Sequence, residues 1–402
     1  MNNNNNNINN NNQEAMDKMS DEATATVSSS GLNPYTDPSV ASVLQCVTAE
    51  SNAFAPYDDK IHLYHFATSL CSQVTRLVLE EKQLPYESHH VTIVAGVHEQ
   101  YEPDYVRLNR RCVVPTLVTP TGKVTTDTTN IMFYLESKEF TSSSVGIKNS
   151  TSSDMHNSIH LMPPTSNPKE QALVKQFVAL GDGVACEVLT FGTIPGAPPL
   201  PSPYRHLVKG THEQAAKELR QLIDVHKDDN YLRDSYQGKL DLILINQDMM
   251  EQPLKLKAVM DATHAAMEQL NQQLVNGPFS TTPNNQGWLC SDHQYTLADC
   301  QWAVVLYRFK FRNIADLFYA SQYPAIVAYT ERLWARPAFQ KAVVKWEQKH
   351  VVVPYLIRSK LRKRFQQHNN NNNKSSLVVM AASAVVVVAA LWQLGRHRQS
   401  GR

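Results

Sequence analysis

This sequence has almost no net charge and no apolar run at its N-terminus. Its 402 residues include 38 Lys and Arg against 37 Asp and Glu, which gives a formal net charge of +1. That balance argues against a nucleic-acid binder that relies on overall positive charge. The first residues are almost all Asn, so no secretory signal peptide is expected there.

Cysteine is also scarce, with six residues scattered along the chain and no CxxC pair. A domain of this size with such spacing does not require a disulfide framework, and a reducing cytosolic setting fits better. His293 lies three residues after Cys290, but no second Cys/His pair matches it. We therefore expect no metal site.

The Asn-rich tracts have little apolar surface to bury. Residues 1–13 are nearly pure Asn, and residues 369–373 form a second Asn run. Such tracts cannot offset the conformational entropy that is lost on ordering. We predict that residues 1–57 form a disordered Asn/Ser-rich N-terminus.

Near the C-terminus, residues 375–395 carry no charge, and residues 377–394 are nearly all Val, Ala, Leu and Met. As a helix, this run would span about 27 Å, enough to cross a bilayer's hydrocarbon core. A buried core helix is the alternative. The polar Asn linker before the segment and the basic tail at 396–402 favour a transmembrane tail anchor, with the bulk of the protein in the cytosol.

Hydrophobic periodicity between residues 58 and 140 predicts a small α/β domain. The expected order is strand, helix, strand, helix, two strands joined by a turn at Thr121-Gly122, and a final helix. The predicted ranges are 60–67, 70–82, 86–94, 99–108, 115–118, 123–126 and 130–137. A βαβ unit followed by a ββα unit is the thioredoxin-like order.

The second half is predicted to be helical. A Ser/Asn/Pro-rich linker at 141–168 precedes an all-helical domain at 169–350, which is broken by a Pro-rich loop at 192–203. Two long helices, at 219–248 and 254–274, belong to an insertion at about 205–275. A basic segment at 351–374 follows, and it is expected either to lie on an anionic membrane surface or to be the last helix of the folded domain.

Ser69 is the first candidate site residue, because it lies where the first strand turns into a helix. The N–H groups and the positive dipole end of a helix N-terminus favour an anion such as a thiolate. A hydroxyl at this position can hydrogen-bond a bound thiolate and lower its pKa. The alternative is that Ser69 or Ser72 only caps the helix.

Two further candidates follow within the same unit. The Val114-Pro115 bond at the head of a strand is expected to be cis, so that the backbone of Val114 can pair with a peptide ligand. An ordinary strand-starting Pro is the alternative. At the start of the next helix, Asp127 could bind an ammonium group and the Thr128 hydroxyl a carboxylate, or both could be capping residues.

These three sites, in this order, resemble the glutathione-binding domain of the glutathione transferases. Ser69 lies where that family keeps its catalytic Ser or Cys, Val114-Pro115 at its Val-Pro, and Asp127 and Thr128 at its acidic and hydroxyl pair. The resemblance implies a fold with a thioredoxin-like N-terminal domain and an all-α C-terminal transferase domain. It also implies glutathione as co-substrate, a hydrophobic electrophile or lipid-like ligand as second substrate, and a homodimer.

More of the chain is similar to one branch, the ganglioside-induced differentiation-associated proteins. The matching stretches include Leu63-Tyr64-His65, Arg76-Leu77-Val78, Arg107-Leu108-Asn109, Trp288-Leu289-Cys290 and Arg308-Phe309-Lys310-Phe311. The helical insertion, the basic segment and the apolar tail agree in order. This resemblance implies a tail-anchored protein of the mitochondrial outer membrane or of peroxisomes, with a role in redox homeostasis and in mitochondrial dynamics such as fission.

Several residues qualify this resemblance. Cys71 stands where branch relatives commonly have Ser, so it is either a reactive thiol whose pKa is lowered by the helix N-terminus or a buried small residue. Thr128 keeps a hydroxyl that favours glutathione binding, whereas Arg110, Arg111 and Cys112 replace the usual residues before Val-Pro. Thr296 and Asp299 have the spacing of a helix capping box, a folding signal.

The sequence therefore predicts a membrane-anchored glutathione transferase-like protein. If the protein is an enzyme, Ser69 would stabilise the glutathione thiolate, while Val114, Asp127 and Thr128 would hold the tripeptide. The alternatives are a non-catalytic scaffold on the organelle surface and a sensor of hydrophobic ligands that uses the same fold.

Overall fold

A four-stranded sheet lies at the centre of the N-terminal half, in the strand order β2-β1-β3-β4. The computed structural model describes residues 58–143, 159–199, 210–278 and 287–370. β1 pairs parallel with β2 and antiparallel with β3, which pairs antiparallel with β4. The strands are β1 (His62–His65), β2 (Glu87–His90), β3 (Thr116–Val118) and β4 (Val124–Thr126). This is the predicted thioredoxin-like sheet.

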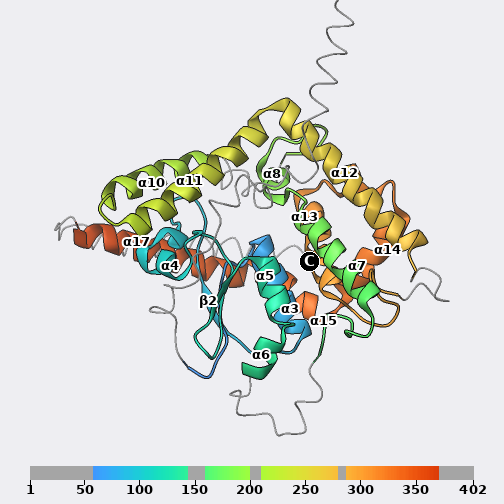
Figure 1. The fold of residues 1–402 in the computed structure, drawn as a ribbon. Coiled ribbons are helices and arrows are strands. Elements are labelled where there is room, and N and C mark those ends of the chain that lie inside the picture. Colours follow the sequence, from blue (N-terminus) through green and yellow to red (C-terminus); the bar gives the residue numbers. More distant parts are fainter. Residues whose placement is uncertain (1–57, 144–158, 200–209, 279–286, 371–402) are drawn as a thin grey trace, which may run out of the picture.

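The side chains of β1 and β3 alternate between two apolar layers, as expected from the two-residue period of a strand. Leu63 and Leu117 pack in the main core. That core includes apolar residues of α3 (Leu70–Glu81) and α5 (Thr128–Tyr134). Val118 instead belongs to a separate apolar cluster with residues of α4 (Pro103–Leu108). The sheet is thus covered on both faces, and α3 and α5 lie on the side of the helical domain (Figure 1).

Several predicted elements of this domain are shorter than expected, and the bonds of two of them show why. The strand predicted at 86–94 ends at His90, because the Thr92 N–H donates to Glu99 Oε2 at 2.7 Å and so leaves the ladder. The helix predicted at 99–108 is a 3₁₀ turn, η3 (Glu99–Tyr101), followed by α4, which begins at Pro103. A proline has no N–H to continue the preceding turn but suits the first turn of a new helix.

The remaining elements are helical. They are α6 (Lys138–Ser143), α7 (Pro168–Asp182), α8 (Cys186–Phe191), α10 (Thr211–Val225), α11 (Asn230–Glu251), α12 (Pro253–Asn276), α13 (Leu297–Arg312), η6 (Asp316–Ala320), α14 (Pro324–Ala335), α15 (Pro337–Phe339), η7 (Gln340–Val344), α16 (Lys345–Glu347) and α17 (Lys349–Asn370).

Helix α13 forms the centre of the helical domain. Trp302 is fully buried, and its indole N–H donates to the Phe177 carbonyl of α7 at 2.9 Å. The capping box predicted at its start is confirmed, because the Thr296 side chain accepts from the Asp299 N–H and the Asp299 carboxylate accepts from the Thr296 N–H at 2.8 Å. The buried Asp299 also accepts from the Tyr329 hydroxyl at 2.6 Å. These bonds satisfy a carboxylate that would be costly to bury alone.

The single long helix predicted at 219–248 is wrong. The chain forms two helices, α10 and α11, which pack against each other. The turn between them contains Asp229, whose side chain accepts from the Leu232 N–H at 3.1 Å and so caps α11. An Asp at this position offers a free helical N–H a partner, and this favours a new helix start over continuation of the old one.

The α10–α11 hairpin packs on η3 and α4 of the N-terminal domain, whereas Met249 near the end of α11 joins the main core. A second apolar cluster joins Leu219, Leu232 and Leu240 to Tyr101 and Val106. The Tyr236 hydroxyl donates to the Tyr101 carbonyl at 2.8 Å. The hairpin therefore reaches across the molecule to α4, while α12 returns toward α14 (Figure 1).

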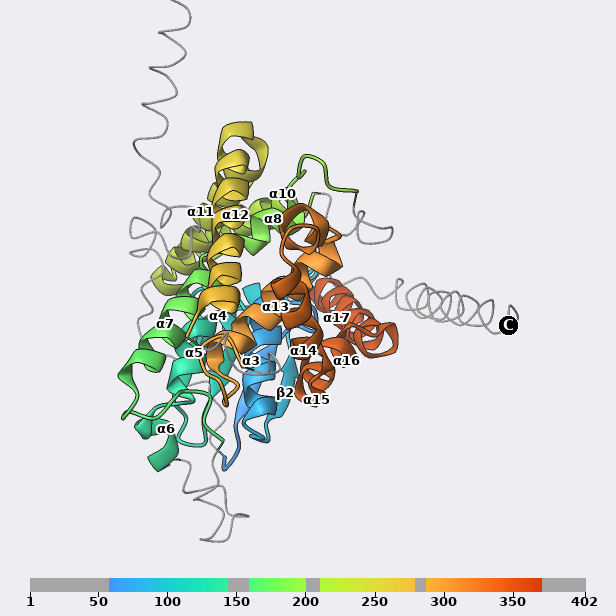
Figure 2. The ribbon, with the colours of Figure 1, turned by 90° about the vertical axis from the view of Figure 1, so that its right-hand side faces the viewer.

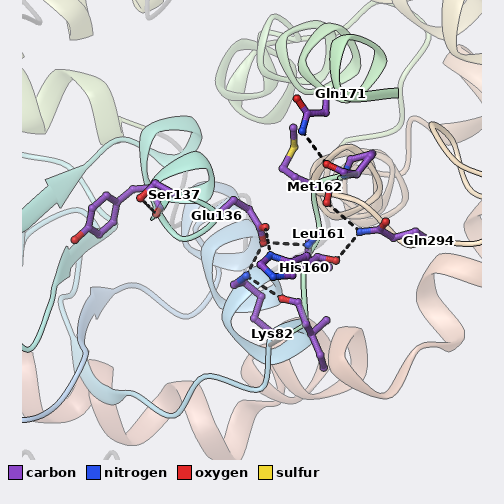
Figure 3. Close-up of polar contacts among 11 residues, drawn as sticks. Lys82, Glu136, Ser137, His160, Leu161, Met162, Gln171 and Gln294 are labelled. Atoms are coloured by element: carbon purple, nitrogen blue, oxygen red, sulfur yellow. Dashed lines mark hydrogen bonds and ion pairs between the residues drawn. The ribbon is translucent and has the colours of Figure 1, made fainter. Parts of the chain in front are cut away.

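Of the linker predicted at 141–168, the start belongs to α6, and the described stretch at 159–167 is joined to both domains (Figure 3). Glu136 accepts from the Lys82 ammonium at 2.6 Å and from the Leu161 N–H at 3.0 Å, and the Lys82 and Glu136 side chains are both almost fully buried. From the helical domain, Gln294 donates to the carbonyls of His160 and Met162. The two domains are thus joined by a fixed segment as well as by their core.

Of the two alternatives for the basic segment, the structure has a helix, α17, packed on the folded domain. The Tyr355 ring stacks on His90 at 4.2 Å between centroids, and Ser359 Oγ lies 2.8 Å from Thr92 Oγ1. Lys363 pairs with Glu218 of α10 at 2.6 Å. α17 and α7 lie on opposite sides of the molecule in both views (Figure 2). Arg358, Lys360 and Arg364 remain exposed.

Several predicted segments lie outside the described residues. They are the Asn-rich N-terminus at 1–57, the middle of the linker, the transmembrane segment at 375–395 and the basic tail at 396–402. Within the ranges that are described, no helix is both long enough and apolar enough to span a bilayer.

Candidate functional site

Ser69 ends the β1–α3 turn and caps α3. Its hydroxyl oxygen accepts from the Ser72 N–H at 3.4 Å, a long hydrogen bond. Ser69 therefore caps α3, and its O–H proton is left available to donate. Ser72, the other capping candidate, is fully buried, and its oxygen instead accepts from the Phe66 N–H at 3.2 Å.

Two arginines hold the turn that precedes Ser69. Arg308 of α13 donates to the Thr68 carbonyl at 2.6 Å. The fully buried Arg76 donates to the Ala67 carbonyl at 2.7 Å and, through Nε, to the Ala342 carbonyl of η7 at 2.8 Å. Burial lowers the pKa of both guanidinium groups, to about 10 for Arg76. These charge-assisted bonds fix the start of α3 against the helical domain.

Cys71 is the second residue of α3 and is exposed, but protein atoms lie close to its thiol. Desolvation by these neighbours raises the pKa of the Cys71 thiol to about 11. A hydrogen bond from the Thr128 hydroxyl lowers this pKa but does not offset the rise. Asp182, Asp127 and Glu187 add to the rise. The predicted lowering of the Cys71 pKa by the helix N-terminus is therefore wrong, because desolvation, together with three nearby carboxylates, raises the pKa. The alternative of a buried residue is also wrong.

Thr128 and Asp127 stand at the start of α5, next to Cys71. Thr128 is buried, and its hydroxyl bonds the Cys71 thiol. Asp127 has a positive φ of 73°, and one of its oxygens accepts from the Asn130 N–H at 3.1 Å, the predicted cap. Its other oxygen pairs with Arg111 Nη1 at 3.0 Å. Asp127 is thus a capping residue that also carries an ion pair.

The loop from Asn109 to Pro115 brings Arg111 and Val114 to the same place. The Val114-Pro115 bond is cis, as expected. Asn109 organises the loop, since its amide donates to the Val113 carbonyl at 2.9 Å and its oxygen accepts from the Arg111 N–H at 3.0 Å. Within the described ranges, no hydrogen bond joins the backbone N–H or C=O of Val114 to another residue.

Three residues near Cys71 were missed by sequence reasoning, namely Asp182 at the end of α7 and Cys186 and Glu187 at the start of α8. Desolvation and then the nearby charge of Asp127 raise the pKa of Asp182 to about 6. Desolvation likewise raises the pKa of Cys186 to about 12. No local pattern marks these residues as site residues, because they reach Cys71 only through the packing of the two domains.

The predicted residues Ser69, Cys71, Asp127 and Thr128 therefore come together where α3 and α5 meet, and Val114 and Pro115 lie at the head of β3. Family models for the glutathione S-transferase N-terminal and C-terminal domains match residues 68–138 and 252–332, in that order. The chain belongs to the glutathione S-transferase superfamily.

Individual relatives within this superfamily are distant. A 2,5-dichlorohydroquinone reductive dechlorinase of Sphingobium indicum is 27% identical over 320 residues, which cover 73% of this chain and 84% of that protein. Human ganglioside-induced differentiation-associated protein 1-like 1 is 25% identical over 304 residues, covering 73% and 76%. A solved β-etherase from Sphingobium sp. strain SYK-6 aligns with a TM-score of 0.47 and 20% identity, covering 70% of this chain and 98% of that one.

Proposed function

We propose that this chain binds glutathione where α3, α5 and the loop from Asn109 to Pro115 meet, and joins its sulfur to a hydrophobic electrophile. The observation that carries this proposal is the convergence of Ser69, Thr128 and Val114 from three separate stretches. Together they offer hydroxyl donors, a carboxylate beside them at Asp127, and backbone groups of Val114 without partners among the described residues.

Each of these groups suits one part of the tripeptide. The backbone of Val114 can pair with the cysteinyl residue as an added strand would. Asp127 can accept the γ-glutamyl ammonium group. The Ser69 O–H can donate to the thiolate, which favours its charged form. The thiolate then attacks the electrophilic carbon, a C–S bond forms, and the leaving group departs with its electron pair.

Titration of glutathione into the full-length chain tests the binding step. Wild type should bind in the micromolar to millimolar range, and Thr128→Val should weaken binding about tenfold, since a hydrogen bond to a charged ligand group is lost. Thr129→Val is the matched control, because Thr129 follows on the same helix and no described contact joins it to Cys71. Failure of the well-folded wild type to bind would refute the proposal and favour the non-catalytic scaffold.

Turnover of 1-chloro-2,4-dinitrobenzene tests the chemical step. Ser69→Ala should lower kcat by about 10²–10³, the usual loss when one donor to a reacting anion is removed. Binding of glutathione should change little, because the remaining contacts are intact. Equal kcat for wild type and Ser69→Ala would remove Ser69 from the mechanism.

A second candidate, favoured by the exposed Cys71, is reductive removal of a halogen from a hydroquinone, as in the name of the bacterial relative. This needs two electrons, which the thiols of Cys71 and glutathione supply when they form a disulfide. The raised pKa of Cys71 opposes attack by its thiolate, so this reaction ranks second. Cys71→Ser should abolish the dehalogenated product but leave conjugation intact.

We further propose that residues 375–395 anchor the chain in the mitochondrial outer membrane, with the folded part in the cytosol and a role in redox homeostasis or mitochondrial dynamics. The support is the uncharged run of 21 residues between basic flanks, together with the similarity to the human ganglioside-induced relative. Peroxisomal membranes are the alternative location.

A further inference from the structure

We infer that Arg308 binds an anionic group on the second substrate, so that the preferred electrophiles are hydrophobic compounds that carry a carboxylate. This inference rests on the proposed function, because it concerns the compound that reacts with the glutathione sulfur. Arg308 lies on α13, and its Nη2 donates to the Thr68 carbonyl at 2.6 Å. The guanidinium therefore contacts the residue directly before Ser69, whose hydroxyl is proposed to hold the thiolate.

Arg308 differs from the buried arginines Arg76 and Arg312 in how few of its nitrogens are bonded. In Arg76, each of the three guanidinium nitrogens donates to an acceptor of the protein. In Arg312, each of the three donates to a backbone carbonyl. Among the residues that the structure describes, Arg308 donates only through Nη2, to Thr68 and to Gln73 Oε1 at 3.3 Å. Its Nε and Nη1 keep their N–H donors for a ligand.

The positive charge of Arg308 is also without a direct counter-ion. No carboxylate in the described ranges forms an ion pair with the guanidinium. Glu347 exerts the largest charge effect on it, but the Glu347 oxygens accept from Gln73 Nε2 at 2.8 Å and from the Tyr307 hydroxyl at 3.0 Å. A half-buried cation without an ion-pair partner is costly, and a ligand anion would offset this cost.

Arg308 is opposite in sign to most of the charged groups around the site. Its guanidinium lies close enough to the thiols of Cys71 and Cys186 for their charges to interact with it. The carboxylates that act on Cys71 belong to Asp182, Asp127 and Glu187. These groups would repel an anionic electrophile, and Arg111 is already paired with Asp127 at 3.0 Å. Of the described cations near Cys71, Arg308 is thus the one that can receive an anion.

A pair of electrophiles that differ in charge tests this inference. They are 4-chloro-3,5-dinitrobenzoate and its neutral counterpart 4-chloro-3,5-dinitrobenzamide. In both, the glutathione thiolate forms a C–S bond at the chlorinated carbon, and chloride leaves with its electron pair. The full-length wild type should have a lower KM for the benzoate. Arg308→Gln removes the charge but keeps an N–H donor for the Thr68 carbonyl. It should raise the KM of the benzoate about 10- to 100-fold, as expected for a lost hydrogen bond to a charged group.

The KM of the benzamide should stay within about twofold in Arg308→Gln. Lys310→Gln is the matched control, because Lys310 is an exposed cation on the same helix, with its ammonium 4.7 Å from the centroid of the Trp334 ring. It should change neither KM. Arg308→Lys, which keeps the positive charge, should recover part of the affinity for the benzoate, and thermal melting should establish that each variant is folded.

An equal loss of kcat/KM for both electrophiles in Arg308→Gln would show that Arg308 only positions the turn before Ser69. An unchanged KM for the benzoate would place Arg308 outside the substrate site. Either result overturns the inference and leaves the proposed function standing. If Arg308→Gln does not fold, equal KM values of wild type for the two electrophiles overturn the inference. Conjugation of neither electrophile by wild type overturns both the inference and the proposed function.

Discussion

At the scale of single residues, Cys71 is exposed, but its thiol should react slowly as a nucleophile at neutral pH. Its pKa of about 11 means that only a small fraction is thiolate at neutral pH. Alkylation by iodoacetamide should therefore be slow at pH 7.5, and its rate should rise about tenfold per pH unit up to pH 10. Mass spectrometry of the Cys71 peptide measures this rate. A plateau below pH 9 would contradict the raised pKa, whose main cause is desolvation of the thiol.

Thr128→Val supplies the control for that experiment. The Thr128 hydroxyl is the group whose hydrogen bond lowers the Cys71 pKa, so its removal should slow alkylation further at each pH. An unchanged rate would show that the hydroxyl does not reach the sulfur.

Asp182 should make stability depend on pH. Its pKa is about 6 in the folded chain against 3.8 as the model value, so folding favours the protonated carboxyl. The associated stability is present below about pH 4 and is lost as the pH rises through 6. Asp182→Asn removes the titrating carboxyl, so the variant keeps its stability as the pH rises. The gain in free energy of unfolding over wild type should be about 1–3 kcal/mol larger at pH 7.5 than at pH 4.

Urea unfolding at the two pH values measures the effect of Asp182→Asn. Asp224→Asn, on the exposed face of α10, is the control and should show no such difference between pH 4 and pH 7.5. If Asp182→Asn instead destabilised the chain more at pH 7.5 than at pH 4, the folded state would stabilise the ionised carboxylate of Asp182.

The site residues that the sequence predicted were those marked by local signals. Ser69 and Asp127 precede helices, and Val114 precedes a proline, so each could be found from a few neighbouring residues. Asp182 and Cys186 lie more than 100 residues beyond Cys71, and nothing nearby in the sequence connects them to it. The direction of the Cys71 pKa was missed for the same reason, because its causes lie on α5, α7 and α8.

At the scale of elements, the buried pair of Lys82 and Glu136 fastens the segment between the domains. Their side chains are 6% and 4% exposed. Glu136→Leu should destabilise the chain by about 3–5 kcal/mol, because it leaves the Lys82 ammonium buried without its partner. The double variant Lys82→Met, Glu136→Leu should recover most of this loss, since an apolar pair can replace a buried ion pair at little cost.

The exposed pair of Lys123 and Glu139 is the matched comparison. Its side chains are 42% and 61% exposed, so Glu139→Leu should cost no more than about 1 kcal/mol. Equal urea midpoints for the two single variants would show that Lys82 finds another partner when Glu136 is replaced.

The types of the elements followed from periodicity, but several boundaries did not. Alternation and helical spacing predicted the thioredoxin-like order correctly, because both reflect burial on one face. The ends of β2 and the break between α10 and α11 depend on particular bonds, from Thr92 to Glu99 and from Leu232 to Asp229. Such a bond competes with continuation of the element, and the pattern of apolar residues does not record it.

At the scale of the whole molecule, α17 links the folded domain to the proposed anchor. One face of α17 packs through Tyr355 and Ser359, while Arg358, Lys360 and Arg364 are exposed. These exposed cations suit an anionic lipid surface, where each contributes about 1 kcal/mol. The packed face means that the folded domain and α17 would approach such a surface together.

The anchor itself can be tested by charge. Val386→Asp with Val387→Asp places two carboxylates at the centre of the apolar run, each costing roughly 2.5–3.5 kcal/mol for insertion. In cells that express the full-length chain, wild type should stay in the membrane pellet after alkaline carbonate extraction and colocalise with an outer-membrane marker, whereas this variant should be released. Asn371→Asp with Asn372→Asp adds the same charge before the run and should remain in the pellet. Release of wild type, or retention of the Val386/Val387 variant, would mean that residues 375–395 do not span a bilayer. Colocalisation with a peroxisomal marker would support the anchor but place it in the peroxisomal membrane.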